Sequence, residues 1–294
     1  MDPFLTIIIP SYNRAEKLEA CLSHLIGQNL NAESYEILVV NDGSTDETQA
    51  VLEKWREKKQ IHVFTQKNQG QGVARNLAIK NARGFITLFM GDDIYAAPNF
   101  LIKHVEFHKE NPEPNKACLG LTEWDPNHEI TPFMDWMVSG GYQFSYHKLT
   151  PNQEASFWFF YTSNLSIKTE LLKQNLFDTD FKSYGWEDTE LGYRLMKKHQ
   201  LKLIFKPEAL AYHDHFLEEG SLKSKMQSLV KNGKIFEAKH PELQVLPQGV
   251  KKNILQMLSS SPMRALLKGI SPFSSRVQRA YWYVLAKHYF LSQI

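Results

Sequence analysis

The first hundred residues alternate short apolar runs with amphipathic stretches, and this alternation limits the possible fold more than any other feature. The apolar runs LTIIIP, YEILVV, IHVFTQ and FITLF are rich in strand-forming residues. The stretches between them, Arg14 to Leu25, Asp46 to Lys58 and Ala74 to Ala82, have helical periodicity. Short apolar strands separated by helices are typical of βαβ units. The sequence therefore predicts an α/β fold with a parallel sheet.

Polar residues follow each of the four apolar runs. In chain order these groups are Ser11-Tyr12-Asn13, Asn41-Asp42-Gly43, Asn68 to Gly72, and Asp92-Asp93. Open parallel sheets bind ligands outside the carboxyl ends of their strands. We therefore expect the four groups to meet along one edge of the sheet and to form an acidic, hydrogen-bonding site.

Two adjacent carboxylates, Asp92 and Asp93, end the apolar run from Ile86 to Met90. Like charges side by side repel each other, so the pair indicates either a solvated turn or a place for a cation or a ligand hydroxyl. Asp42 allows two interpretations as well. It belongs to an Asp-Gly turn, or its carboxylate accepts from the N–H edge of a nucleobase.

The stretch NQGQGVARN contains a fragment of a dinucleotide-binding motif, but Arg75 replaces the third glycine and the stretch follows the third strand. It is either a flexible loop before a helix or a place where the backbone approaches a ligand that Arg75 contacts.

In SYGWEDTELGYRL, Glu187 and Asp188 lie at the start of a predicted helix, where capping and the helix dipole explain acidic residues. Tyr184 and Trp186 precede them, and flat aromatic surface beside carboxylates suits a bound sugar. A carboxylate there also suits a general base for a hydroxyl group.

His213 and His215 in AYHDHF lie on one face if the segment is extended. Either they are structural, or they are metal ligands that follow a strand.

The net charge of +2 argues against a general nucleic-acid binder. Residues 221–294, however, contain 12 Lys/Arg and only 2 Asp/Glu. A basic segment is either a solvated face or faces an anionic partner such as a membrane surface. Its aromatic residues suit a helix that lies in a membrane interface, or they pack against the catalytic domain or a second subunit of a homo-oligomer.

The two cysteines, Cys21 and Cys118, lie in unrelated elements, which fits a reducing compartment better than a disulfide framework. The N-terminal sequence MDPFLTIIIP has no basic region of a secretory signal, and no apolar run approaches the ~20 residues that span a bilayer. We expect a cytoplasmic protein, either free or peripheral on the inner face of the membrane.

Five stretches, IIIPSYNR, EILVVNDGSTDET, NQGQGVARN, FMGDDIYAAP and GWEDTELGYRL, occur in the order and spacing of glycosyltransferase family 2. The chain resembles this family over residues 4–110 and 160–215. The resemblance implies an inverting, nucleotide-sugar-dependent enzyme with the GT-A fold. The expected domains are a GT-A domain at 1–220, with a nucleotide-sugar-binding half at 1–115 and an acceptor-binding half at 116–220, and a helical C-terminal extension at 221–294.

The resemblance also implies roles for the donor-binding residues. Pro10 and Tyr12 would line the base pocket, and Asp42 would accept from a uracil N–H. Arg75 would lie near the base or ribose, and Asp92 would bind the ribose hydroxyls.

Asp93 would coordinate a divalent cation, Mn²⁺ or Mg²⁺, that bridges the diphosphate, with His213 or alternatively His215 as a further ligand. Asp188 would be the catalytic base and Glu187 would orient the acceptor beside Trp186 and Tyr184. Met90 stands where many members of the family have a further Asp.

The predicted function is transfer of a hexosyl or N-acetylhexosaminyl group from a UDP-sugar to a glycan or lipid-linked acceptor in glycan or polysaccharide biosynthesis. One alternative is a non-catalytic nucleotide-sugar-binding or scaffold protein with the same fold. The other is a nucleotidyltransferase, but PSYNRAEK lacks the glycine-rich loop that such an enzyme carries after its first strand.

Overall fold

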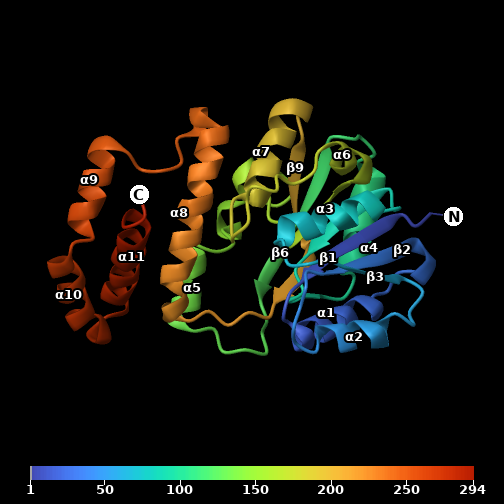
Figure 1. Ribbon diagram of the computed structural model, residues 1–294, viewed down its shortest axis with the longest axis horizontal. Coiled ribbons are helices and arrows are strands. Elements are labelled where there is room, and N and C mark those ends of the chain that lie inside the picture. Colours follow the sequence, from blue (N-terminus) through green and yellow to red (C-terminus); the bar gives the residue numbers. More distant parts are fainter. Residues whose placement is uncertain (1) are drawn as a thin grey trace. The chain divides into compact units, whose positions relative to one another are not determined.

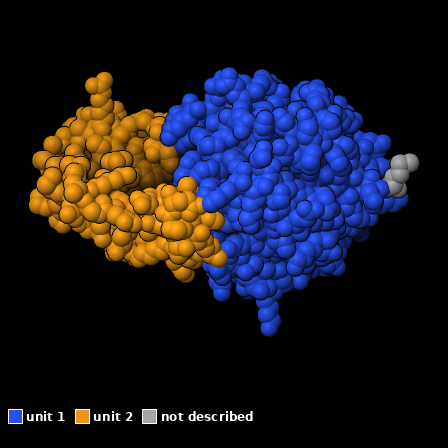
Figure 2. All heavy atoms as spheres, turned by 90° about the horizontal axis from the view of Figure 1, so that it is seen from above, with its two compact units in different colours: residues 1–129, 144–182, 187–215 blue, residues 130–143, 183–186, 216–294 orange. Residues whose placement is uncertain are grey.

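The computed structural model describes residues 2–294, and these form two compact units that Figure 2 colours separately. The first unit contains the residues up to 129 together with 144–182 and 187–215, and the second contains 130–143, 183–186 and 216–294. The expected boundary at residue 220 stays a prediction.

Four parallel strands in the order β3-β2-β1-β4 form half of the sheet in the first unit (Figure 1). They are β1 (Leu5–Ser11), β2 (Tyr35–Asn41), β3 (Ile61–Thr65) and β4 (Ile86–Met90). The helices between them are α1 (Ala15–Ile26), α2 (Thr48–Trp55) and α3 (Gln71–Asn81). The predicted succession of βαβ units is therefore confirmed.

The two faces of this half-sheet are covered by different helices. Ile7 of β1 packs in one buried cluster with Leu18 of α1, whereas its neighbour Ile8 packs in another with Ala74 of α3. Figure 1 shows α1 and α2 on one side of the sheet and α3 on the other. Because both faces are covered, successive residues of each strand are apolar, which explains the unbroken apolar runs in the sequence.

The other half of the sheet is mixed. Strand β8 (Asn164–Lys168) lies antiparallel between β4 and β6 (Lys116–Trp124), and β6 runs parallel to β9 (Lys202–His213). The short strands β5 (Ile94–Ala96) and β7 (Glu154–Ala155) pair antiparallel with β9. The helices of this part are α4 (Phe100–Glu110), α6 (Thr169–Gln174) and α7 (Glu187–His199). The expected α/β sheet is thus present, with its antiparallel pairings beyond β4.

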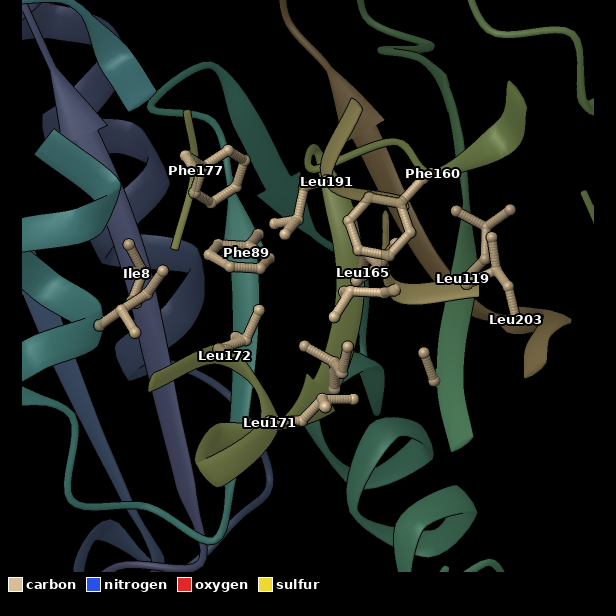
Figure 3. Close-up of a cluster of buried hydrophobic side chains, with 14 of the residues drawn as sticks. Ile8, Phe89, Leu119, Phe160, Leu165, Leu171, Leu172, Phe177, Leu191 and Leu203 are labelled. Atoms are coloured by element: carbon tan, nitrogen blue, oxygen red, sulfur yellow. The ribbon is translucent and has the colours of Figure 1, made fainter. Parts of the chain in front are cut away.

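A cluster of buried apolar side chains joins the two halves of the sheet (Figure 3). Phe89 of β4 and Leu165 of β8 belong to it, and Phe160 lies among them with none of its surface exposed. Helix α7 contacts this ring directly. A Cβ atom at Gly192 of α7 would come within 2.6 Å of the Phe160 Cβ, so only glycine allows the approach. The ring therefore helps to position the helix that begins with Glu187.

We expect Phe160→Ala to lower the free energy of unfolding by about 3–5 kcal/mol, because it removes a fully buried ring and leaves a cavity beneath α7. Urea unfolding followed by circular dichroism measures the change. Phe273→Ala is the matched control, because Phe273 is 86% exposed and its loss should change stability by less than about 0.5 kcal/mol. A loss below about 1 kcal/mol for Phe160→Ala would contradict the role of this ring in the core.

The second unit is helical. It contains α5 (Pro132–Ser139), α8 (Leu222–Lys239), α9 (Gly249–Leu258), α10 (Ser261–Ile270) and α11 (Ser275–Leu291). Helix α11 packs against α8 and against α9 and α10 (Figure 1). Trp282 of α11 is 3% exposed, and its ring packs on Phe133 and Trp136 of α5. The expected helical extension is confirmed, and at Trp282 the aromatic side chain serves packing within the chain.

Among residues 2–294, we find no helix with both the length and the apolar character needed to cross a bilayer.

Candidate active site

The loops that follow the four parallel strands contact one another at one edge of the sheet. The Ser11 hydroxyl, at the end of β1, donates to an oxygen of Asp92, beyond β4, at 2.8 Å. The Thr45 N–H, in the loop after β2, donates to the Asn13 side chain after β1 at 2.7 Å. The structure therefore brings together the groups whose convergence the strand pattern predicts.

Asp42 holds the glycine-rich loop that precedes α3. Its carboxylate accepts hydrogen bonds from the Gln66 side chain at 2.7 Å and from the backbone N–H groups of Gln69 and Gly70 at 3.0 and 2.9 Å. A carboxylate offers about four lone-pair positions, so about one remains for a ligand. The loop also requires Gly43, which has a φ of +79° and whose Cβ would lie 2.7 Å from a backbone nitrogen. The role of Asp42 toward a nucleobase stays a prediction.

Pro10 and Tyr12 lie on either side of the end of β1. Pro10 pairs with Val40 of β2, and Tyr12 follows the strand with 46% of its surface exposed. An exposed ring beside the Asp42 loop is compatible with stacking on a base. The role of Pro10 and Tyr12 in lining a base pocket stays a prediction.

Asp92 and Asp93 are both nearly buried and share the guanidinium group of Arg14. Burial and the charge of Asp93 raise the pKa of Asp92 to about 7, although Arg14 opposes the shift. Because both carboxylates are buried and pair with Arg14, the turn is not a solvated one, and the cation-binding role of the pair stays a prediction. Sequence reasoning missed Arg14. Its place directly after β1 becomes informative only once β1 and β4 are known to be neighbours.

His213 and His215 both lie beside Asp93. The antiparallel pairing of β5 with β9 places His213 opposite Ile94, and therefore next to Asp93. From Asp93 Oδ2, the His213 Nε2 is 3.3 Å away and the His215 Nδ1 is 3.4 Å away. The two imidazole rings stack at 5.2 Å, as expected for alternate residues of an extended segment.

These three side chains fit a divalent metal ion. Their ligand atoms lie within 4.8 Å of one another, and a carboxylate with imidazoles is a donor set that first-row divalent metals accept. Burial acts to raise the pKa of Asp93, but His213, His215 and Arg14 hold it well below its usual range. Asp93 is therefore ionised, as a metal ligand must be. The sequence left the choice between the two histidines open, and the structure places both beside the carboxylate.

A second group of similar side chains, Asp125, His128 and Asp214, adjoins the first, because Asp214 stands between His213 and His215 and its backbone N–H donates to the Asp93 carbonyl at 2.9 Å. Asp214 already accepts from Lys17 at 2.6 Å and pairs with His128 at 2.7 Å. Asp93 is also paired, with Arg14, so such partners do not separate the two groups; Asp93, however, has two imidazole nitrogens beside one carboxylate oxygen, whereas Asp214 has one.

The start of α7 places two carboxylates beside Arg75. Glu187 and Arg75 are 3% and 5% exposed, and Arg75 Nη1 lies 3.6 Å from Glu187 Oε1. The Gln71 amide donates to the same oxygen at 2.7 Å. Burial and the charge of Asp188 raise the pKa of Glu187 to about 7, against the effect of Arg75. Burial also raises the pKa of Asp188, although Arg75 opposes this shift as well.

Arg75 connects the two groups of carboxylates. Burial lowers its pKa, while the charges of Glu187, Asp188 and Asp92 raise it. One guanidinium group therefore interacts with the acidic residues at the start of α7 and with one that follows β4. These residues, far apart in the chain, belong to one electrostatic site.

Buried polar atoms without a hydrogen-bond partner gather in this site. In the part of the chain that the structure describes, they include the Nε and Nη1 of Arg75, the Oε2 of Glu187 and the Nδ1 of His213. The indole nitrogen of Trp124, whose ring stacks on His213 at 5.3 Å, is another. Each such atom costs about 1–3 kcal/mol. Their concentration in one place is what a site built around a polar ligand requires.

Trp186 and Tyr184, the expected acceptor-binding residues, belong to the second unit and have partners within it. The Trp186 indole donates to the Leu229 carbonyl at 2.8 Å, and its ring packs on Phe236. Tyr184 is 48% exposed, and the Lys225 ammonium lies 4.8 Å from its ring centre. Contact with an acceptor stays a prediction for both residues.

Solved structures identify the class of fold. The chain aligns over 98% of its length with 86% of a mannosyltransferase from Pyrobaculum calidifontis in complex with GDP-Man and Mn²⁺, with a TM-score of 0.65 and 18% identity. It aligns over 97% of its length with 90% of S. aureus TarS 1–349 in complex with UDP, with a TM-score of 0.57 and 18% identity. The fold is therefore the GT-A fold of glycosyltransferases, as expected.

The sequence also identifies the family. The model of glycosyl transferase family 2 matches residues 6–181, and the chain belongs to this family. A curated relative, the validoxylamine A glucosyltransferase of Streptomyces hygroscopicus subsp. jinggangensis (strain 5008), is 28% identical in an alignment of 265 positions that covers 82% of this chain and 62% of the relative. The chain spans 58–62% of the length of three such relatives.

Proposed function

We propose that this chain is an inverting glycosyltransferase that moves a sugar from a nucleoside diphosphate to an acceptor hydroxyl. The observation that carries the proposal is the group of unpartnered buried atoms on Arg75, Glu187 and His213. A scaffold protein that binds nothing there would bear their desolvation cost without compensation. The donor that we propose is a UDP-sugar, with Asp42 accepting from the uracil N–H, and the related TarS structure contains UDP.

In this proposal Asp93 and His213 would hold a divalent cation, Mn²⁺ or Mg²⁺. His215 would be a further ligand or would take the place of His213. Imidazole ligands favour Mn²⁺ over Mg²⁺, and the related mannosyltransferase structure contains Mn²⁺. When bound, the cation neutralises the charge that develops on the diphosphate leaving group. Asp92 accepts from the ribose hydroxyls, and Arg75 lies near the base or ribose.

Asp188 acts as the general base on the acceptor. It takes the proton of the acceptor hydroxyl while that oxygen bonds to the anomeric carbon, and the bond from this carbon to the diphosphate breaks on the opposite side. A single displacement of this kind inverts the configuration. A carboxylate whose pKa is raised is a stronger base than an ordinary aspartate. Glu187 orients the acceptor, and Trp186 and Tyr184 contact the apolar face of its sugar.

A donor screen tests the function. The chain is incubated with a panel of UDP-sugars and GDP-sugars in the presence of Mn²⁺, and release of the free nucleotide is measured with and without EDTA. We expect slow, metal-dependent hydrolysis of at least one UDP-sugar. A nucleotidyltransferase would instead form a nucleotide-sugar from a sugar phosphate and a nucleoside triphosphate. A non-catalytic protein would show a thermal shift with a donor but release no nucleotide.

The proposed base predicts how transfer depends on pH. Burial and Asp188 raise the pKa of Glu187 to about 7, and burial raises the pKa of Asp188, so the coupled pair takes up its first proton near neutrality. We expect kcat/KM to fall about tenfold per pH unit on the acidic side. In Glu187→Gln, Arg75 acts on Asp188 without a competing carboxylate, so the acidic limb should move to lower pH. An acidic limb at the pH of an ordinary aspartate in the wild type would contradict this assignment.

A further inference from the structure

Helices α9 and α10 of the second unit, both fully described, contain no buried residue. Each contacts α11 on one side. Nevertheless, seven of the fourteen large apolar side chains that are exposed within residues 2–294 lie between Val250 and Phe273, in α9, in α10 or just after α10. They are Val250, Ile254, Met257, Leu258, Leu266, Ile270 and Phe273, which we call the exposed apolar face.

The exposed apolar face follows helical spacing. Val250, Ile254 and Met257 recur along one side of α9 and are 73%, 48% and 68% exposed. Leu266 and Ile270 are one turn apart on α10, and Phe273, just beyond it, is 86% exposed. A group of this size at the surface indicates an interaction rather than chance exposure.

The charge around this face has one sign. Residues 243–294 contain seven Lys/Arg and no Asp/Glu. Arg279 pairs with Asp135, and Lys287 lies over the rings of Tyr142 and Tyr283, so these two are occupied. Lys251, the residue after Val250 on α9, and Lys268, on the side of α10 opposite Leu266 and Ile270, are both exposed. Neither has an acidic partner in the described part of the chain.

We propose that the exposed apolar face binds the surface of a membrane that contains anionic phospholipids. The apolar side chains enter the boundary between headgroups and acyl chains, while the lysines remain among the anionic headgroups. A second copy of the chain fits this face less well, because a symmetric contact would oppose two surfaces of the same charge. The proposal goes beyond sugar transfer and does not depend on it.

Co-sedimentation with vesicles tests the proposal on the full chain. We expect binding to vesicles of phosphatidylcholine with phosphatidylglycerol, little binding to phosphatidylcholine alone, and a loss of binding at high salt. Three variants are compared. The basic variant carries Lys251→Gln, Lys252→Gln and Lys268→Gln. The apolar variant carries Met257→Gln, Leu266→Gln and Phe273→Gln. The control carries Lys58→Gln, Lys59→Gln and Lys80→Gln, which change the net charge as much as the basic variant does, but at exposed lysines of the first unit.

The basic variant should bind anionic vesicles about 100-fold more weakly than the wild type, since each lysine near an anionic surface contributes severalfold. The apolar variant should lose at least about as much, and the control should bind like the wild type. Failure of the wild type to bind anionic vesicles, or equal binding by all three variants, would overturn the proposal. A dimer in light scattering that only the apolar variant disrupts would show that a second copy covers the face. No donor or acceptor is present, so either failure leaves the proposed function unaffected.

Discussion

The Asp188→Asn variant should lose ~10²–10⁴-fold in the rate of sugar transfer and keep its affinity for the donor. Asparagine has nearly the same shape as aspartate, and its carbonyl oxygen can still accept the Thr189 N–H that Asp188 accepts at 2.8 Å. What it lacks is basicity, so the acceptor hydroxyl would have to attack while it still carries its proton. The donor should bind normally, because Asp188 is not among the proposed donor ligands and asparagine keeps the shape of the side chain beside Arg75.

Initial rates with the donor found in the screen measure the first effect, and isothermal titration with UDP and Mn²⁺ measures the second. Asp180→Asn is a suitable control, because it makes the same chemical change at an exposed position of the first unit. Thermal unfolding should be nearly the same for both variants. An Asp188→Asn enzyme with more than about a tenth of the wild-type rate would place the base elsewhere.

The Asp93→Asn variant should lose the metal dependence of donor binding. Asparagine preserves the shape of the side chain but removes the charge that the two histidines surround. Changes to groups that only support a metal ligand weaken metal binding ~10–100-fold, so removing a charged ligand should cost at least about 100-fold. Isothermal titration with UDP, in Mn²⁺ and in EDTA, should give the same weak affinity for the variant under both conditions.

The chain itself offers the control for this experiment. Asp125 belongs to the second group of Asp and His side chains, and its Oδ1 accepts from the Asn127 N–H at 2.9 Å. Asp125→Asn keeps that acceptor, and we expect the Mn²⁺ effect on donor binding to be unchanged. If Asp125→Asn abolished the effect and Asp93→Asn did not, the metal would belong to the second group, and the assignment of Asp93 would be wrong.

Much of the parallel half of the sheet could be predicted because its signals are local. The apolar runs that became β1, β2 and β4 are buried on both faces, so each shows in the sequence as an uninterrupted run. The rule that parallel strands end at a common edge then predicts, from the sequence alone, that Asp42 and Asp92 lie at one edge of the sheet.

Arg14 shows what such reasoning misses. Its contact with Asp92 and Asp93 depends on β1 and β4 being neighbours, although α1, β2, α2, β3 and α3 all lie between them in the chain. The partners of Asp42 are a similar case, because its contacts with Gln66 and Gly70 require β2 and β3 to pair in their observed register. The sequence within a few residues of Asp42, Asp92 or Asp93 contains no signal that predicts these partners.

The sequence by itself determined which residue types stand at the ends of the strands, and hence the acidic chemistry available to this protein. Periodicity and burial act over a few residues, so they can be read along the chain. Only the tertiary structure decided that His213 and His215 both flank Asp93 and that Arg75 interacts with carboxylates from two distant segments. Strand pairing between β5 and β9 and the packing of α7 on Phe160 produce these contacts, because hydrogen bonding and core packing join segments that the chain itself keeps far apart.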